Sequence, residues 1–150
     1  MFDFFRTVKR RADAIKIADK VAPILIEASG MELYFNDRKR FSEIAVQDDF
    51  ILSYFYGVIV CSIGSSQEQL HPETTGYFLM EIFERLFPGF GQSALEKCNI
   101  RRAEGDEKFA SGGNLGFEEM EKAIGSIEAA EKEVKILYSL HRHILQLPLG

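Results

Sequence analysis

Apolar residues are densest between Phe50 and Ile63, which predicts that this segment forms the centre of the core. The segment is rich in β-branched and aromatic residues, so its composition is compatible with a strand as well as with a helix. Apolar positions recur in steps of three and four back to Phe41, which indicates one face of a helix. We therefore predict a buried helix, because the run is too long for a typical strand and shorter than the about 20 residues that cross a bilayer.

Three further segments before residue 100 show helical patterning. Asp3 is suited to cap a helix that runs toward Ala22, with a kink or a restart at Pro23. A second helix is predicted from Pro72 to Phe87, apolar round most of its circumference, and it should pack on the central segment. Residues 92–99 predict a short helix that follows the Pro-Gly turn at 88–89.

The last third of the chain combines a polar stretch with a long apolar pattern. Residues 101–116 are charged and then rich in glycine, which predicts a long connection, mobile or functional. A final helix is expected from Phe117 to about Gln146. Its back half carries a second apolar stripe, consisting of Ala129, Ile136, Leu140, His143 and Leu147. A helix that is apolar on two sides is buried on both, so this half either threads the core or joins a self-association surface.

These patterns predict an all-α fold, a single-domain bundle of four or five helices over residues 1–150 with a long C-terminal helix. A chain of 150 residues fits one domain. With 46% hydrophobic and 27% charged residues, the composition is that of an ordinary globular protein.

Charge and cysteine usage refine this picture. The net charge is −5, although residues 1–40 hold an excess of Lys and Arg over Asp and Glu. A basic end on an acidic body can steer an anionic partner. Cys61 and Cys98 lie far apart in the sequence, so free buried thiols in a reducing, cytoplasmic setting are expected. The N-terminus does not resemble a secretory signal, which agrees with that expectation.

The first helix has the pattern of an element that lies on an anionic membrane or docks on an acidic partner. Three aromatic residues, Phe2, Phe4 and Phe5, stand at its start, and Arg6 and Lys9 fall on the face opposite its apolar positions. The alternative is a core helix with a solvated basic face. Alanines at 12, 18 and 22 favour that alternative, because they suit close helix packing.

No cluster of residues predicts a metal site, a cofactor site or a catalytic centre. His141 and His143 are two residues apart, which turns them about 200° away from each other on a helix. Asp48 and Asp49 border the apolar core segment, and a carboxylate held there could act as an acid or base. We prefer the interpretation that one of them caps the helix beginning at Phe50. Cys98 could be a nucleophile only with a base from elsewhere in the fold. The acidic chain also lacks a basic recognition helix, so nucleic-acid binding is not expected.

Three functional hypotheses follow, in order of preference. The first is a small acidic, non-enzymatic protein-interaction module, such as an adaptor, a regulator or an immunity-type protein, which self-associates into a homo-oligomer or binds a protein partner. Its interaction residues would be Ile136, Leu140, His143 and Leu147. The second is peripheral membrane association through Phe2, Phe4, Phe5, Arg6 and Lys9. The third is an enzyme with a site near Asp48 or Cys98.

Overall fold

The computed structural model describes residues 2–29, 38–64, 70–128 and 137–147, and the regular secondary structure in these ranges is helical throughout. Seven helices follow one another in these ranges: α1 (Phe2–Ser29), α3 (Arg38–Val46), α4 (Asp49–Gly64), α5 (Pro72–Leu86), α6 (Gly91–Ala103), α7 (Glu107–Glu128) and α8 (Tyr138–Leu145). The predicted all-α class is therefore confirmed. The predicted number of four or five helices is too low.

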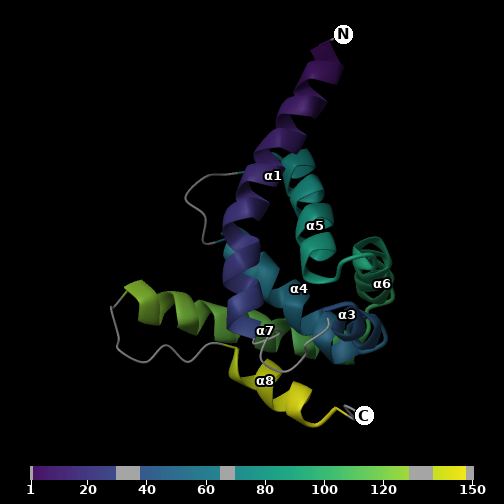
Figure 1. Cartoon of the computed structure of the whole chain (residues 1–150), viewed down its shortest axis with the longest axis vertical. Coiled ribbons are helices and arrows are strands. Elements are labelled where there is room, and N and C mark those ends of the chain that lie inside the picture. Colours follow the sequence, from purple (N-terminus) through teal and green to yellow (C-terminus); the bar gives the residue numbers. More distant parts are fainter. Residues whose placement is uncertain (1, 30–37, 65–69, 129–136, 148–150) are drawn as a thin grey trace.

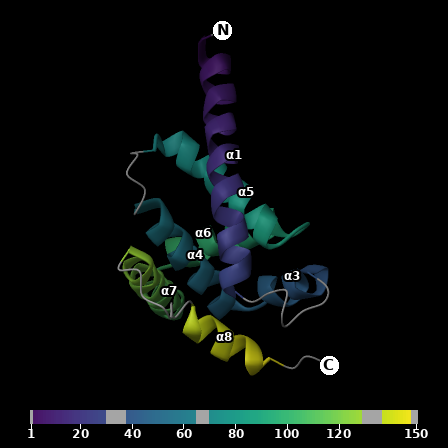
Figure 2. The same ribbon diagram turned by 60° about the vertical axis from the view of Figure 1, so that its left-hand side comes forward.

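Helix α1 stands along α5 and extends beyond its start, so the first turns of α1, ahead of the contact of Arg10 with Glu73, project from the rest of the molecule (Figures 1 and 2). The remaining helices form a broad base, with α7 lying against α4 and α8 at the opposite end from the N-terminus. The molecule thus has a narrow tip made by α1 and a wide base that contains most of the chain.

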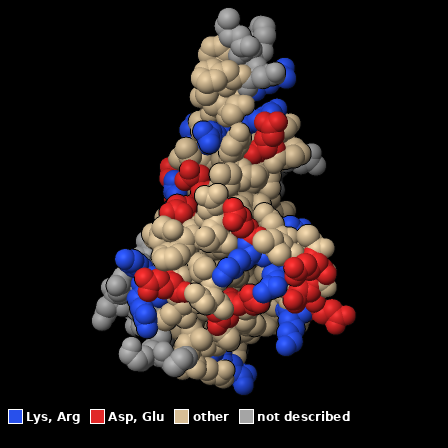
Figure 3. All heavy atoms as spheres, turned by 90° about the vertical axis from the view of Figure 1, so that its right-hand side faces the viewer, with Lys and Arg blue, Asp and Glu red and all other residues tan. Residues whose placement is uncertain are grey.

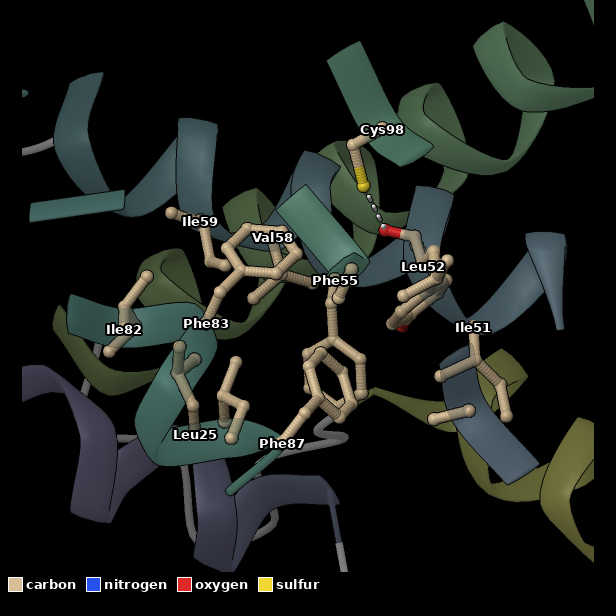
Figure 4. Packing of buried hydrophobic residues seen from close by; sticks show 14 of the residues in the cluster. Leu25, Ile51, Leu52, Phe55, Val58, Ile59, Ile82, Phe83, Phe87 and Cys98 are labelled. Atoms are coloured by element: carbon tan, nitrogen blue, oxygen red, sulfur yellow. Dashed lines mark hydrogen bonds between the residues drawn. The ribbon is translucent and has the colours of Figure 1, made fainter. Parts of the chain in front are cut away.

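The core is centred on α4 and α5, as the apolar pattern predicted. Phe55 of α4 meets Phe87 edge to face, with ring centroids 5.6 Å apart, and Phe83 of α5 lies 6.0 Å from Phe87. Such tilted arrangements are the favoured ones for aromatic pairs. Leu25 of α1 closes this cluster from the other side (Figure 4). Because α4 spans Asp49–Gly64, residues 50–63 are helical, and the helix alternative is confirmed.

The helical face that continues back to Phe41 is divided between two helices. Asp48 interrupts it, because its Oδ1 accepts the amide of Ile51 at 3.1 Å and caps the start of α4. Among the described residues, no single helix has the length and apolarity of a membrane span. The segments Lys39–Val46 and Asp49–Gly64 meet that criterion only as a pair, bent by 100° at the break.

The predicted long connection at 101–116 is wrong, since α6 continues to Ala103 and α7 begins at Glu107. Gly105 lies in the short turn between the two helices, whereas Gly112, Gly113 and Gly116 lie inside α7 and face α4. A Cβ added to Gly116 would lie 2.2 Å from the carbonyl oxygen of Tyr54, and one added to Gly57 would lie 1.9 Å from that of Gly113. Only glycine lets the two backbones approach this closely, which offsets its poor helix propensity.

The predicted single C-terminal helix is also wrong. Helix α7 starts ahead of Phe117 and ends at Glu128, whereas α8 begins after Leu137, whose φ of 47° is left-handed and incompatible with a continuous helix. Residues 129–136, which include the predicted stripe positions Ala129 and Ile136, lie outside the described part of the chain. Leu137 itself is fully buried.

Helix α1 runs through Pro23 to Ser29 as one helix, so of the two alternatives the continuous helix is observed and no second helix starts at Pro23. Of the three alanines predicted to pack, Ala18 and Ala22 are buried and Ala12 is exposed, whereas Ala14, which was not predicted, is buried with them. Helix α5 covers the buried alanines. Ion pairs from Arg10 to Glu73 and from Arg85 to Asp19 fix the two helices in a parallel arrangement. This packing leaves the other sides of α1 open.

Candidate functional site

A row of apolar side chains on α1 faces solvent. The exposed fractions are 68% for Phe4, 62% for Phe5, 50% for Val8 and 40% for Ile15. Together with Ala12 these residues form what we call the exposed stripe, which follows steps of three and four along one side of the helix. The rings of Phe4 and Phe5 touch edge to face at 5.9 Å. Large apolar groups gathered on a projecting helix are a sign of an interaction surface.

Basic residues flank the exposed stripe on both sides. At 100° per residue, Lys9 and Lys16 follow it on one side and Arg11 on the other. Figure 3 shows the narrow end of the molecule as uncharged surface edged by Lys and Arg. Of the sequence-predicted membrane residues, Phe4, Phe5, Arg6 and Lys9 are exposed. The side chain of Phe2 lies outside the description.

A second feature, which we call the basic groove, runs between α1 and the start of α5. It encloses about 680 Å³ and is lined by Arg6, Lys9, Arg10, Lys16 and Lys20 from α1 and by His71 and Thr74 from α5. At 100° per residue the five cations fall within an arc of about 120°, so one side of α1 supplies them all. Asp13 also lines the groove, and Glu73 pairs with Arg10. The lining therefore keeps an excess of positive charge.

The start of α5 forms the other wall of this groove. Pro72 occupies the first turn, and Nδ1 of His71 accepts the amide of Glu73 at 3.1 Å. This ring nitrogen acts as the cap that a serine or aspartate supplies in most helices. Because Nδ1 accepts a hydrogen bond, it carries no proton in this arrangement.

A separate cavity, of about 420 Å³, lies between α4 and α7 with Tyr56, Phe109 and Phe117 in its lining. Arg102 closes one side, since its guanidinium lies 4.7 Å from the centre of the Tyr56 ring and also donates to the Tyr56 hydroxyl at 2.6 Å. Two polar groups of the lining, the Tyr56 hydroxyl and the Arg102 guanidinium, are thus engaged with each other.

The C-terminal residues that were predicted to bind a partner lie largely inside the protein. Leu140 is 0% exposed and belongs to the core, so its assignment to an open surface is corrected. Nε2 of His143 lies 2.8 Å from Oδ2 of Asp48, and its ring packs 4.4 Å from that of Phe50. Leu147 packs partly buried against the core. Ile136 lies outside the described residues. The described part of this stripe holds α8 against the base, in keeping with the core-threading alternative.

The two residues of the enzyme hypothesis lie in different surroundings. Burial raises the pKa of the Cys98 thiol to about 12, an effect that nearby Arg102 only partly opposes. The thiol points at the carbonyl oxygen of Leu52, 3.8 Å away (Figure 4). A protonated, buried thiol is a poor nucleophile. Asp48 is occupied by its cap and by His143, and no group of three metal-ligating side chains occurs among the described residues.

The sequence pattern gave no signal for a polar junction at the base. The hydroxyl of Tyr54 donates to Oε1 of Glu119 at 2.8 Å, and the amide of Ser139 donates to the same oxygen at 2.8 Å. Burial, followed by the hydrogen bond to Glu119, raises the pKa of Tyr54 far above its usual value. The junction ties α4, α7 and the start of α8 together, which is a structural role.

Comparison with known proteins returns no match: no family model, curated protein or solved structure is similar to this chain. The chemistry of its own surface is therefore the basis for a functional conclusion.

Proposed function

We propose that the protein is a non-enzymatic interaction module that binds anionic membrane surfaces peripherally through the exposed stripe of α1. The observation that carries this proposal is the projecting position of Phe4 and Phe5, more than half exposed, on a helix whose basic residues flank its apolar side. An interfacial helix places its apolar side in the headgroup region and its Lys and Arg beside anionic lipids.

Charge distinguishes this partner from a second copy of the chain. If two copies of α1 packed stripe to stripe, Lys9, Lys16 and Arg11 of each would lie beside basic residues of the other. Like charges next to such a contact oppose association, whereas anionic lipid satisfies the flanks and the stripe together. A lipid surface also accepts a short stripe without requiring a complementary groove.

Vesicle binding tests the proposal directly. Purified protein is mixed with vesicles of phosphatidylglycerol and phosphatidylcholine, and the bound fraction is measured by sedimentation. We expect binding to the anionic vesicles that weakens as salt is raised, because the attraction of exposed charges is screened. The double variant Phe4→Ala/Phe5→Ala should lower the partition coefficient by about tenfold or more, since each ring loses most of its apolar burial.

A matched control is available on α6, where Ile100 is 54% exposed outside the exposed stripe. Ile100→Ala should bind vesicles as the wild type does. Equal binding by the Phe4/Phe5 variant, or binding that ignores lipid charge and salt, would refute the membrane proposal. Circular dichroism of both variants checks that the fold is retained.

A protein partner with an acidic amphipathic helix is the second candidate, favoured by the same basic flanks. Arg6, Lys9 and the exposed stripe would then contact the partner helix. This candidate predicts no vesicle binding at low salt. Either partner is compatible with the cytoplasmic setting that the two free cysteines suggest, which remains a prediction.

A further inference from the structure

The basic groove holds a buried polar group that has no partner among the described residues. Thr74 is only 4% exposed, and its hydroxyl makes no hydrogen bond within the part of the chain that the structure describes. Buried hydroxyls are almost always paired, so an unpaired one at the wall of a cavity indicates a bound group.

The backbone at the same place offers a second donor. Thr74 lies in the first turn of α5, where amides have no acceptor within the helix. The amide of Glu73 donates to Nδ1 of His71, whereas the amide of Thr74 has no acceptor among the described residues. A hydroxyl and an amide at a helix N-terminus are suited to bind an anion, which the helix dipole also favours.

The cations of the opposite wall are available to such an anion. Lys9, Lys16 and Lys20 are exposed, and none of them forms an ion pair with a described acid. From Arg6 to Lys20 the cations cover about 21 Å of helix, which is longer than a single phosphate and suits a ligand with several charges. The cavity of about 680 Å³ lies within the size range of small-molecule sites.

The groove meets the exposed stripe at Lys9 and Lys16, but most of its lining lies on another side of α1. Arg6, Arg10 and Asp13 lie roughly opposite Phe4, Val8 and Ile15 when residues are placed at 100° intervals. A membrane that holds the stripe would therefore leave most of the groove open to solution. A ligand of the groove can therefore be inferred from Thr74 and the groove cations alone, without the proposed membrane contact.

We propose that the basic groove binds a ligand with two or more phosphate groups. One phosphate accepts hydrogen bonds from the hydroxyl and amide of Thr74, and Lys9, Lys16 and Lys20 neutralise the remaining charge. The ligand chemistry is a di- or polyphosphate, whether it is carried by a soluble molecule or by a lipid headgroup.

Titration calorimetry with inorganic pyrophosphate tests the site on the full chain. We expect one molecule bound per chain, with an affinity that falls as salt is raised. Thr74→Val keeps the side-chain shape and removes the hydroxyl, and Lys16→Gln/Lys20→Gln removes two exposed charges. Each should weaken binding by about tenfold. Lys122→Gln, an exposed lysine on α7, is the matched control and should bind like the wild type.

The outcomes separate the groove from the exposed stripe. Pyrophosphate binding that survives in Phe4→Ala/Phe5→Ala shows that the groove works alone, even if vesicle binding fails. The absence of pyrophosphate binding, or equal binding by the Thr74 and Lys16/Lys20 variants, would overturn the proposal. If Thr74→Val lowers the melting temperature sharply, the lysine variant still decides the question.

A second arm identifies the source of the phosphate. Vesicles that contain a lipid with a diphosphate headgroup are titrated with pyrophosphate. Release of protein by pyrophosphate assigns the groove to the headgroup. Continued binding, with pyrophosphate bound at the same time, assigns it to a soluble ligand. Either result supports a phosphate site in the groove.

Discussion

At the scale of single residues, burial rather than charge pairing decides the chemistry of the ionisable groups in the core. Cys98 and Tyr54 both have raised pKa values, and in each case loss of solvent is the largest cause. A buried group is kept in its neutral form because its charged form loses hydration. These residues therefore contribute stability in the neutral form instead of reactivity.

The raised pKa of the Cys98 thiol makes the unfolding free energy depend on pH, and the direction of that dependence can be predicted. The pKa of this thiol rises from 9.0 to about 12 on folding, so the unfolded chain loses the proton first as the pH rises. The contribution to stability is complete below about pH 9 and is lost as the pH rises toward the folded value. We expect the unfolding free energy of the wild type to fall more steeply above about pH 9 than that of Cys98→Ser, by up to about 1.4 kcal/mol per pH unit.

Denaturant melts at several pH values measure both slopes. Alkylation by iodoacetamide gives a second check, because the neutral thiol in the folded protein should react much more slowly than in the unfolded chain. Parallel slopes for the two proteins, together with rapid alkylation of the folded state, would contradict the raised pKa.

At the scale of elements, the contact of α4 with α7 is determined by the size of the side chains between them. Gly57, Gly113 and Gly116 let the two backbones meet, and a Cβ at Gly57 or Gly116 would overlap a carbonyl oxygen of the other helix. This arrangement turns a segment with weak helix propensity into α7, a helix that packs closely along α4. Tertiary packing outweighs the propensity cost of about 1 kcal/mol per glycine.

Alanine at two glycines of α7 should have opposite effects. Gly116→Ala places its Cβ 2.2 Å from the carbonyl oxygen of Tyr54 and should lower the unfolding free energy by about 1–3 kcal/mol or more. Gly125→Ala is the matched control: it meets nothing within 4 Å, and improved helix propensity should raise stability by about 0.5–1 kcal/mol. Urea denaturation measures both values. If the two variants behaved alike, the close contact of α4 and α7 would be refuted.

At the scale of the whole molecule, charge and apolar surface are distributed unevenly. The tip made by α1 carries the exposed stripe and the cations of the basic groove, while the chain as a whole has a net charge of −5. Such asymmetry orients a protein toward an anionic surface. The membrane contact and the phosphate site would therefore operate from two sides of one helix.

The solution mass tests the whole-molecule picture. Because like charges flank the exposed stripe, we expect light scattering during gel filtration to give the monomer mass of 17.1 kDa at low salt. A stable dimer at low salt would contradict the free stripe and would revive the predicted homo-oligomer. Val8→Asp would then show whether α1 forms its interface, since a buried carboxylate there would dissociate it.

Several elements follow from local pattern alone. The apolar density at 50–63 is enough to identify the core helix, and Pro72 marks the start of α5. Ala18 and Ala22 indicate part of the packed side of α1, although Ala12 of the same predicted face is exposed. The basic residues of the groove are recognisable as one helix face. These features depend on periodicity and on local steric rules, which operate within a few residues of each other.

The features that pattern could not provide depend on contacts between distant residues. The glycines at 112–116 have the sequence pattern of a loop, but they form a helix because α4 packs against them. Leu140 has the pattern of a surface residue, but it is buried because the left-handed turn at Leu137 directs α8 toward the base. The pairing of Asp48 with His143 and the burial of Thr74, whose hydroxyl has no partner within the described ranges, likewise arise from distant segments. The sequence by itself determined the helical class, the core segment and the basic amphipathic first helix, because these depend on local spacing. Only the tertiary structure decided where helices break, which apolar residues stay exposed and where the groove forms, because burial depends on which distant side chains occupy the same space.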